Sequence, residues 1–290
     1  MKNKKTMLIV GILLVISLIY TYFTTEMHKI DPEEISENLS VTYLDVGQGD
    51  SSFIEFPNGK CMLIDASISS MGEKIANHIA AKGYEKIDYL VATHPHSDHI
   101  GGMADITSYF EIGTAYLPDA VTDTKVYTNF LKTLKKMNVA VEKAQSGANF
   151  SEGDVKVEFL GPISAEYEDL NNYSAVVKIT YNKKSFLFTG DAEDIVETEL
   201  LNSGANLKAD VLKVGHHGSS SSTTQEFLDA VDPEIAIISC GKDNDYGHPH
   251  KEVLNRLKDA EIKIYRTDVN GNIPIISNGL EVSNYYDLYN

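Results

Sequence analysis

Seven of the nine histidines fall into three short clusters that could bind a metal ion. The clusters are His94-Pro95-His96-Ser97-Asp98-His99, His216-His217 and His248-Pro249-His250. Imidazole and carboxylate groups are the ligands that zinc, manganese and iron take in proteins. The first cluster is too dense to be explained by packing, so it predicts a metal site. The two isolated histidines, His28 and His78, are expected to be ordinary surface or core residues.

The clusters follow segments that are typical of β-strands. Strand-like runs at residues 87–92 and 210–214 end just before the first and second clusters, and a run ending at Phe188 precedes Asp191. Loops at the carboxyl ends of strands in an α/β sheet open into one crevice, where ligands bind. We therefore expect imidazoles and a carboxylate from distant parts of the chain to converge on one cation.

Short β-rich runs alternate with helix-like windows beyond Ser40. Strands are predicted at 41–46, 51–56, 61–64, 87–92, 155–160, 175–181, 185–188, 210–214, 234–239 and 262–265, and helices at 73–82, 125–137, 193–202, 223–230 and 251–260. The segment has no Pro/Gly-rich break near its middle. This pattern predicts a single α/β domain over residues 39–290.

The beginning of the chain predicts a membrane anchor. Residues 7–23 are almost wholly apolar and follow three lysines. As a helix they would span about 25 Å, slightly less than a ~30 Å bilayer core. The lysines place the N-terminus inside the cell, so residues 1–38 would form a cytoplasmic stub, a transmembrane helix and an acidic tether, with the following domain extracellular. The bulky exit of the run argues against a cleaved signal peptide, although secretion after cleavage is the alternative.

Composition limits the classes of function. The chain has 25 Lys and Arg against 42 Asp and Glu, a net charge of −17, which repels nucleic acid unless a local patch or a bound metal offsets it. Its two cysteines, Cys61 and Cys240, cannot build a cysteine-based zinc ribbon. No phosphate-binding glycine motif and no nucleophile elbow occurs, so neither a nucleotide cofactor nor serine hydrolase chemistry is expected.

Several of these segments resemble a known family. Residues 93–102 are similar to the metal-binding signature of the metallo-β-lactamase fold, and residues 44–51 resemble the opening of the extracellular hydrolase domain of ComEC-type DNA-uptake proteins. The likeness continues at Leu63-Ile64-Asp65, Asn171-Asn172-Tyr173-Ser174, Thr189-Gly190-Asp191, Val214–Ser219 and Tyr246–His250, and covers about residues 41–282. The resemblance implies a four-layer αββα sandwich with its site along one edge.

The resemblance also implies a ligand set for one or two divalent ions, zinc or manganese. His94 and His96 would serve the first ion; Asp98, His99 and His216 would serve the second, and Asp191 would bridge the two. Two ions can activate a water for hydrolysis and stabilise a leaving oxygen. No histidine lies between Ile100 and Gly215, so the place of a third imidazole at the first ion falls to Asn171-Asn172. Amide oxygen is a harder ligand, so this first ion should bind loosely or be Mn²⁺.

Further residues are expected to act beside the metals. Asp98, His217 and His248 form the predicted catalytic set: His217, with Ser219 at a helix entry, suits a phosphate oxygen. His248 could donate a proton to a leaving group, hold a phosphate or simply form a turn around Pro249. Asp65 would orient a histidine, Asp50 would lie near the metals or cap a loop, and Asn172 would lie beside the first ion. Lys213 and Arg266 have no assignable role.

The resulting prediction is a membrane-tethered extracellular hydrolase that cleaves phosphodiesters through a metal-activated water, with DNA as the leading substrate. One alternative is an esterase for phosphorylcholine groups of the cell envelope, which would need an aromatic cage for a quaternary ammonium. Another is a tethered binding module that has lost activity, although its intact set of metal-binding residues argues against this. A true β-lactamase is less favoured because the narrower motifs point elsewhere.

Overall fold

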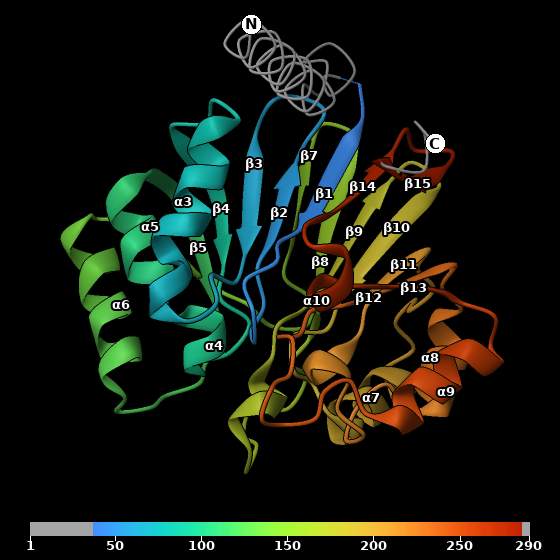
Figure 1. Ribbon diagram of the computed structural model, residues 1–290. Coiled ribbons are helices and arrows are strands. Elements are labelled where there is room, and N and C mark those ends of the chain that lie inside the picture. Colours follow the sequence, from blue (N-terminus) through green and yellow to red (C-terminus); the bar gives the residue numbers. More distant parts are fainter. Residues whose placement is uncertain (1–36, 286–290) are drawn as a thin grey trace, which may run out of the picture.

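Two β-sheets face each other in the computed structural model, which describes residues 37–285 (Figure 1). The eight-stranded sheet has the order β15 (Val282–Asn284), β14 (Ile273–Ser277), β1 (Leu39–Tyr43), β2 (Ser52–Glu55), β3 (Cys61–Ile64), β4 (Lys86–Val91), β5 (Glu111–Leu117) and β6 (Ala140–Lys143). The seven-stranded sheet has the order β13 (Lys263–Arg266), β12 (Ile235–Ile238), β11 (Val211–Lys213), β10 (Lys184–Phe188), β9 (Val176–Tyr181), β8 (Val155–Gly161) and β7 (Asn149–Glu152).

Helices cover the outer face of each sheet, which confirms the predicted αββα layers (Figure 1). The first sheet carries α3 (Gly72–Ala81), α4 (Ser97–Ile100), α5 (Met103–Tyr109) and α6 (Lys125–Lys136), and the second carries α7 (Asp194–Asn202), α8 (Gln225–Val231) and α9 (Lys251–Asp259). Short helices are η1 (Ser69–Met71), η2 (Leu170–Tyr173), η3 (Gly215–Gly218) and α10 (Thr267–Asn270).

Alternation along the strands builds three apolar layers from one chain. In β10, Phe186 and Phe188 point into the layer between the sheets, whereas Leu187 points toward the helices of the second sheet. Successive side chains of a strand lie on opposite faces, so a strand covered on both faces must be apolar throughout. Across the central layer, the rings of Tyr43 and Phe188 stack at 5.7 Å. Burial of each such side chain contributes roughly 1.5–3 kcal/mol.

The parallel parts of both sheets direct strand ends toward one edge. Strands β3 to β6 are parallel neighbours, as are β10 to β13. A helix connects each successive pair, for example α3 between β3 and β4 and α8 between β11 and β12. The carboxyl ends of parallel strands in one sheet lie at the same edge, so the loops that leave them can form a shared site.

The sequence patterns missed the strands β5, β6, β7, β14 and β15 and the α-helices α4, α5 and α10. Strand β6 is exposed along its whole length and therefore has no apolar alternation. Strand β14 contains Pro274, which argues against a strand in a sequence pattern. The predicted anchor at residues 7–23 lies outside the described residues. Within residues 37–285, no helix has the length and apolar character needed to cross a bilayer.

Candidate metal centre

The histidine clusters and Asp191 follow these parallel strands, at the edge of the sheets where the strands end; the helix α4 marks this edge in Figure 1. In the first sheet, β4 leads into α4, which carries Asp98 and His99. In the second sheet, Asp191 follows β10 and His216-His217 follows its parallel neighbour β11. The third cluster comes after β12, the next strand in the same sheet. The topology therefore brings together residues that are far apart in sequence.

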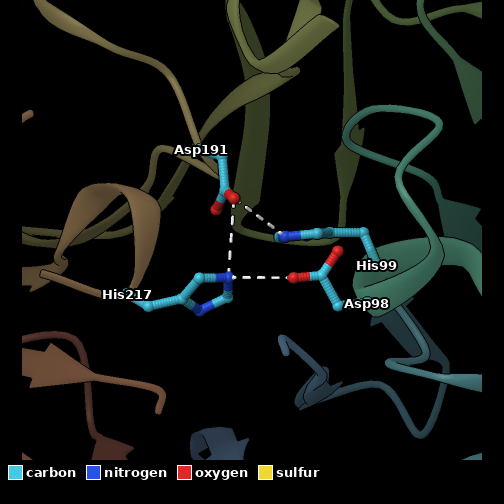
Figure 2. A group of neighbouring side chains, drawn as sticks. All are labelled: Asp98, His99, Asp191 and His217. Carbon is cyan, nitrogen blue, oxygen red and sulfur yellow. Dashed lines mark ion pairs between the residues drawn. The ribbon is translucent and has the colours of Figure 1, made fainter. Parts of the chain in front are cut away.

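Four side chains from both sheets meet at this edge and form what we call the four-ligand group: Asp98, His99, Asp191 and His217. Figure 2 shows the four pointing toward one another. Asp191 Oδ2 lies 3.2 Å from His99 Nε2 and 3.5 Å from His217 Nε2, and His217 Nε2 lies 3.5 Å from Asp98 Oδ2. His99, Asp191 and His217 are buried, whereas Asp98 is partly exposed.

Several atoms of this group are buried without a hydrogen bond. His99 Nε2, His217 Nε2 and Asp191 Oδ1 have no hydrogen-bond partner anywhere in the described part of the chain. An unpaired buried polar atom costs roughly 1–3 kcal/mol, so three at one point indicate a missing partner. Two imidazole nitrogens and two carboxylates are a donor set that suits Zn²⁺ or Mn²⁺. The residues therefore fit a divalent cation.

The local charge balance gives the same answer. The four carboxylates of Asp50, Asp65, Asp98 and Asp191 surround the two imidazoles, and Lys213 is the one lysine or arginine paired with them within residues 37–285. Burial alone lowers the pKa of His99, but the nearby carboxylates of Asp191 and Asp65 outweigh it and hold that pKa well above its usual value. A site that attracts a proton this strongly also attracts a metal cation.

Buried acceptors behind the two imidazoles orient their Nε2 atoms. His99 Nδ1 lies 2.7 Å from Asp65 Oδ2, and Asp65 also accepts from the backbone N–H and the hydroxyl of Thr93 at 2.8 and 2.6 Å. His217 Nδ1 lies 2.9 Å from the carbonyl oxygen of Ser239 and 3.4 Å from Asp50 Oδ1. An Nδ1–H that donates to these acceptors leaves the Nε2 lone pair free for a metal.

A buried lysine pairs with one of the carboxylates behind the imidazoles. The sequence patterns assigned no role to it. Lys213, at the end of β11 and 2% exposed, forms an ion pair with Asp50 and places its Nζ 3.4 Å from the carbonyl oxygen of Gly190. Burial alone raises the pKa of Asp50, but Lys213 and His217 outweigh it and lower that pKa to about 2. The sequence signal that could have indicated this buried lysine is its position within the otherwise apolar run Val211–Val214.

The His94–His96 pair lies beside the group but is held differently. His94 Nε2 lies 3.0 Å from His96 Nδ1 and 4.0 Å from Asp191 Oδ2. His94 Nδ1 lies 3.2 Å from the hydroxyl oxygens of both Thr93 and Ser174. His94 thus lies near the Asp191 carboxylate, which a second ion could share.

Two neighbouring asparagines divide their roles in a way that the sequence did not predict. Asn172, expected beside the first ion, instead binds Glu193: its Oδ1 accepts from the Glu193 N–H at 3.1 Å and its Nδ2 donates to Glu193 Oε2 at 3.3 Å. Asn171 lines the cleft with His96, and its buried Oδ1 has no hydrogen-bond partner among the described residues. Of the two asparagines, Asn171 is therefore the one whose amide oxygen is not engaged in a hydrogen bond within residues 37–285.

His216 and His217 also differ from the expectation. His217, expected at a phosphate, lies in the four-ligand group, whereas His216, expected as a ligand, is 22% exposed with its Nε2 3.8 Å from Asp191 Oδ2. Both residues adopt left-handed backbone conformations, with φ of 47° and 54°. This tight turn directs one imidazole inward and leaves the other beside Glu193 and Ser221, 3.4 and 3.3 Å away.

A cleft of about 310 Å³ opens over the metal-binding residues. Its lining consists of Gln48, His96, Ser97, Asp98, Asn171, Asp191, His216, His217, Tyr246 and His248. Burial, with neighbouring His217 and His216, lowers the pKa of His248 to about 4, so this imidazole is neutral at pH 7. Ser219 is absent from the lining among the described residues; its hydroxyl lies 3.0 Å from that of Ser221.

Comparison with known proteins identifies this arrangement. The model of the family described as "Metallo-beta-lactamase superfamily" matches residues 44–242, which include the four-ligand group. The chain belongs to the metallo-β-lactamase superfamily. Solved structures share its fold: CmlA from Streptomyces venezuelae, a diiron β-hydroxylase, has a TM-score of 0.54 at 17% identity, covering 79% of this chain and 52% of that one. YhfI from Bacillus subtilis, a metallo-β-lactamase fold protein, has a TM-score of 0.53 at 14% identity, with 78% and 96% covered.

Within the superfamily, the chain is similar to competence proteins of ComEC type. "ComE operon protein 3" of Bacillus subtilis is 34% identical over 82% of this chain, and "Competence protein ComA" of Neisseria gonorrhoeae is 31% identical over 83%. "Recombination protein 2" of Haemophilus influenzae is 30% identical over 81%. These alignments cover 33%, 33% and 28% of the relatives, so this metallo-β-lactamase chain spans about a third of their length.

Proposed function

We propose that this protein is a phosphodiesterase that cleaves DNA at the cleft over the four-ligand group. The observation that carries the proposal is the set of buried imidazole and carboxylate atoms without a hydrogen-bond partner, within residues 37–285, at the floor of an open cleft. When bound there, one or two Zn²⁺ or Mn²⁺ ions would activate a water and neutralise charge on a phosphate oxygen.

The chain's own residues would divide the work as follows. The four-ligand group would hold one ion firmly, because Asp65, Ser239 and Asp50 fix its imidazoles. The His94–His96 pair, with Asn171, would hold a second ion more weakly. His216 and His248 line the cleft beside these ligands, where their ring N–H groups can donate hydrogen bonds to phosphate oxygens.

The names of the relatives support DNA as the substrate, since two are a competence protein and a recombination protein. The net charge of −17 opposes tight non-specific binding of DNA, for which lysine and arginine contacts supply most of the affinity. Binding would therefore depend mainly on the metals and the cleft residues. This predicts a nuclease that needs its metal for affinity as well as for cleavage.

The cleft lining favours DNA over phosphorylcholine esters. A quaternary ammonium is held by several aromatic rings that form a cage. Tyr246 is the one tyrosine or phenylalanine lining the cleft in the described part of the chain, and the other lining residues are polar or charged. A single ring can stack on a base but does not enclose an ammonium group.

We also propose that residues 7–23 tether this domain to the outer face of the cell membrane.

The test uses the full-length chain, purified in detergent, stripped with EDTA and reloaded with Zn²⁺ or Mn²⁺. Single-stranded DNA, double-stranded DNA and p-nitrophenyl phosphorylcholine serve as parallel substrates. We expect metal-dependent cleavage of DNA, and loss of both cleavage and bound metal in His99→Ala and Asp191→Ala. The matched control is His78→Ala, which removes a histidine outside the cleft and should leave both unchanged. Turnover of phosphorylcholine alone, or of no phosphodiester at all, would contradict the proposal.

A further inference from the structure

We propose that the ring of Tyr246 is a stacking platform for the nucleobase next to the phosphate that is cleaved. This base-binding subsite rests on the proposed function and adds a specificity-determining residue to it. The platform is the outer end of an aromatic column, which we define as Tyr246, His248 and His217.

The column connects the surface of the protein to the metal-binding residues. The rings of Tyr246 and His248 stack with centroids 5.6 Å apart and planes 20° apart. The rings of His248 and His217 stack in turn, at 6.1 Å and 27°. Since His217 belongs to the four-ligand group, a flat group resting on Tyr246 would lie beside the cleft that contains the reacting phosphate.

Tyr246 is open to a ligand even though one side of its ring is covered. It is 65% exposed while stacked on His248, so its outer side is accessible. The rest of the cleft lining is polar or charged among the described residues, and its other rings are the polar imidazoles of histidines. A planar aromatic ligand attached to a phosphate matches this combination, and a nucleotide has both parts. Base–aromatic stacking accepts every base because each presents a flat face.

The loop that carries Tyr246 is held in place by one side chain. Asn244 Oδ1 accepts from the backbone N–H groups of Tyr246 and His248 at 3.2 and 3.0 Å. Asn244 Nδ2 donates to the carbonyl oxygens of Gly241 and His248 at 2.8 and 2.6 Å. These four bonds fix both ends of the short segment that presents the ring. A preorganised aromatic surface loses little conformational entropy when it binds.

The test compares two oligomers of equal length and charge: oligothymidylate, and the same backbone with tetrahydrofuran abasic sites in place of every nucleotide. We expect the wild type to have a KM about 5- to 100-fold lower for oligothymidylate, the range that stacking of one base supports. Tyr246→Ala should raise that KM to the abasic value with kcat changed less than about twofold. Tyr246→Phe keeps the ring and should retain the preference.

Tyr109, at the end of α5 and 61% exposed, supplies the matched control, because it is equally accessible but does not line the cleft. Tyr109→Ala should leave both KM values unchanged. An equal rise in both KM values in Tyr246→Ala would show a damaged loop, and unchanged values would show that no base rests there; either result overturns the platform.

A binding measurement separates failure of this inference from failure of the proposed function. An oligonucleotide containing 2-aminopurine is mixed rapidly with each metal-loaded variant in a stopped-flow instrument, so that binding is recorded before hydrolysis. Stacking should quench its fluorescence with the wild type and Tyr246→Phe but not with Tyr246→Ala. Quenching without metal-dependent cleavage would contradict the nuclease activity and retain the Tyr246 platform. Cleavage without Tyr246-dependent quenching would contradict the platform and retain the nuclease activity.

Discussion

The two halves of the metal centre contain the same residue type in different surroundings. In the four-ligand group, His99 Nδ1 faces the Asp65 carboxylate and His217 Nδ1 faces the Ser239 carbonyl. In the His94–His96 pair, His94 Nδ1 faces two hydroxyl groups, and its Nε2 contacts the other histidine. A carboxylate or carbonyl acceptor fixes the ring and raises the basicity of the opposite nitrogen, whereas a hydroxyl does so weakly.

The strength with which each half binds an ion is set by the atoms behind the imidazoles. One half has a buried layer of acceptors, Asp50 and Asp65, with Lys213 balancing one of their charges. The other half has neutral hydroxyls behind His94. We therefore expect one firmly bound ion and one labile ion, and the following experiments test that difference.

The largest effect is expected from Lys213, which pairs with Asp50 behind the four-ligand group. Lys213→Met leaves Asp50 buried without its cation, which costs about 3–5 kcal/mol when one partner of a buried pair is removed. Urea unfolding of the metal-free protein measures this loss. The double variant Lys213→Met/Asp50→Asn removes both charges and should recover more than half of the stability. Equal losses in the single and double variants would show that the ion pair does not govern this region.

The next effect distinguishes the two adjacent histidines. His217→Ala removes a member of the four-ligand group and should weaken binding of the firm ion by more than about 100-fold, beyond the range expected for an outer partner. His216→Ala should weaken it less than about tenfold, because that ring is partly exposed and lies 3.8 Å from Asp191 Oδ2. Competition with a fluorescent zinc chelator gives both constants. The reverse order would assign the ligand to His216.

Removal of an outer carboxylate should have an intermediate effect. Asp65→Asn keeps the shape but loses the charge behind His99, so affinity for the firm ion should fall by about 10–100-fold. The matched change on the loose side, His96→Asn, removes an imidazole that contacts His94 and should leave the firm ion unaffected. If both variants weakened the firm ion equally, the contrast between the two halves would be wrong.

The sequence contained enough information for the layers and for the edge that carries the site, but not for the details of the site. Alternating apolar runs such as that of β10 predict strands covered on both faces, and the rule about strand ends brings Asp98, His99 and Asp191 together. The choice between His216 and His217 depends on two left-handed residues in succession. No hydrophobic periodicity predicts that turn. Because His216 and His217 are adjacent and of the same type, the sequence motif is the same whichever of them points inward.

Residues that support the ligands were also beyond the sequence patterns. Lys213 stands in a buried strand as an apparent exception, and its partner Asp50 is distant in the chain, so only the fold reveals the pair. Asn171 and Asn172 are adjacent residues of the same type, so the sequence does not distinguish them. The short helix η2 determines that Asn171 lines the cleft. Tyr246 belongs to a motif, but its exposure becomes apparent only with the cleft around it.

The smallest effect extends the comparison to a histidine away from the cleft. His78 in α3 packs edge-on against Phe53, and its buried Nε2 has no hydrogen-bond partner within the described range. Burial, together with Lys82, lowers the pKa of His78 from 6.5 to about 4. Below pH 6.5 the unfolded chain therefore binds more protons than the folded chain at this residue. Its contribution to stability is complete above pH 6.5 and is lost progressively as the pH falls toward 4.

Because His78 is only partly buried, solvent screening reduces this loss to about 1–2 kcal/mol. His78→Leu should remove it, so the variant should lose less stability than the wild type between pH 7 and pH 4.5 in urea unfolding. His96→Leu, on the loose side of the metal centre, is the control for removal of any histidine. A wild-type profile that matched His78→Leu would mean that His78 titrates normally, and that burial without an acceptor does not by itself disfavour the charged imidazole here.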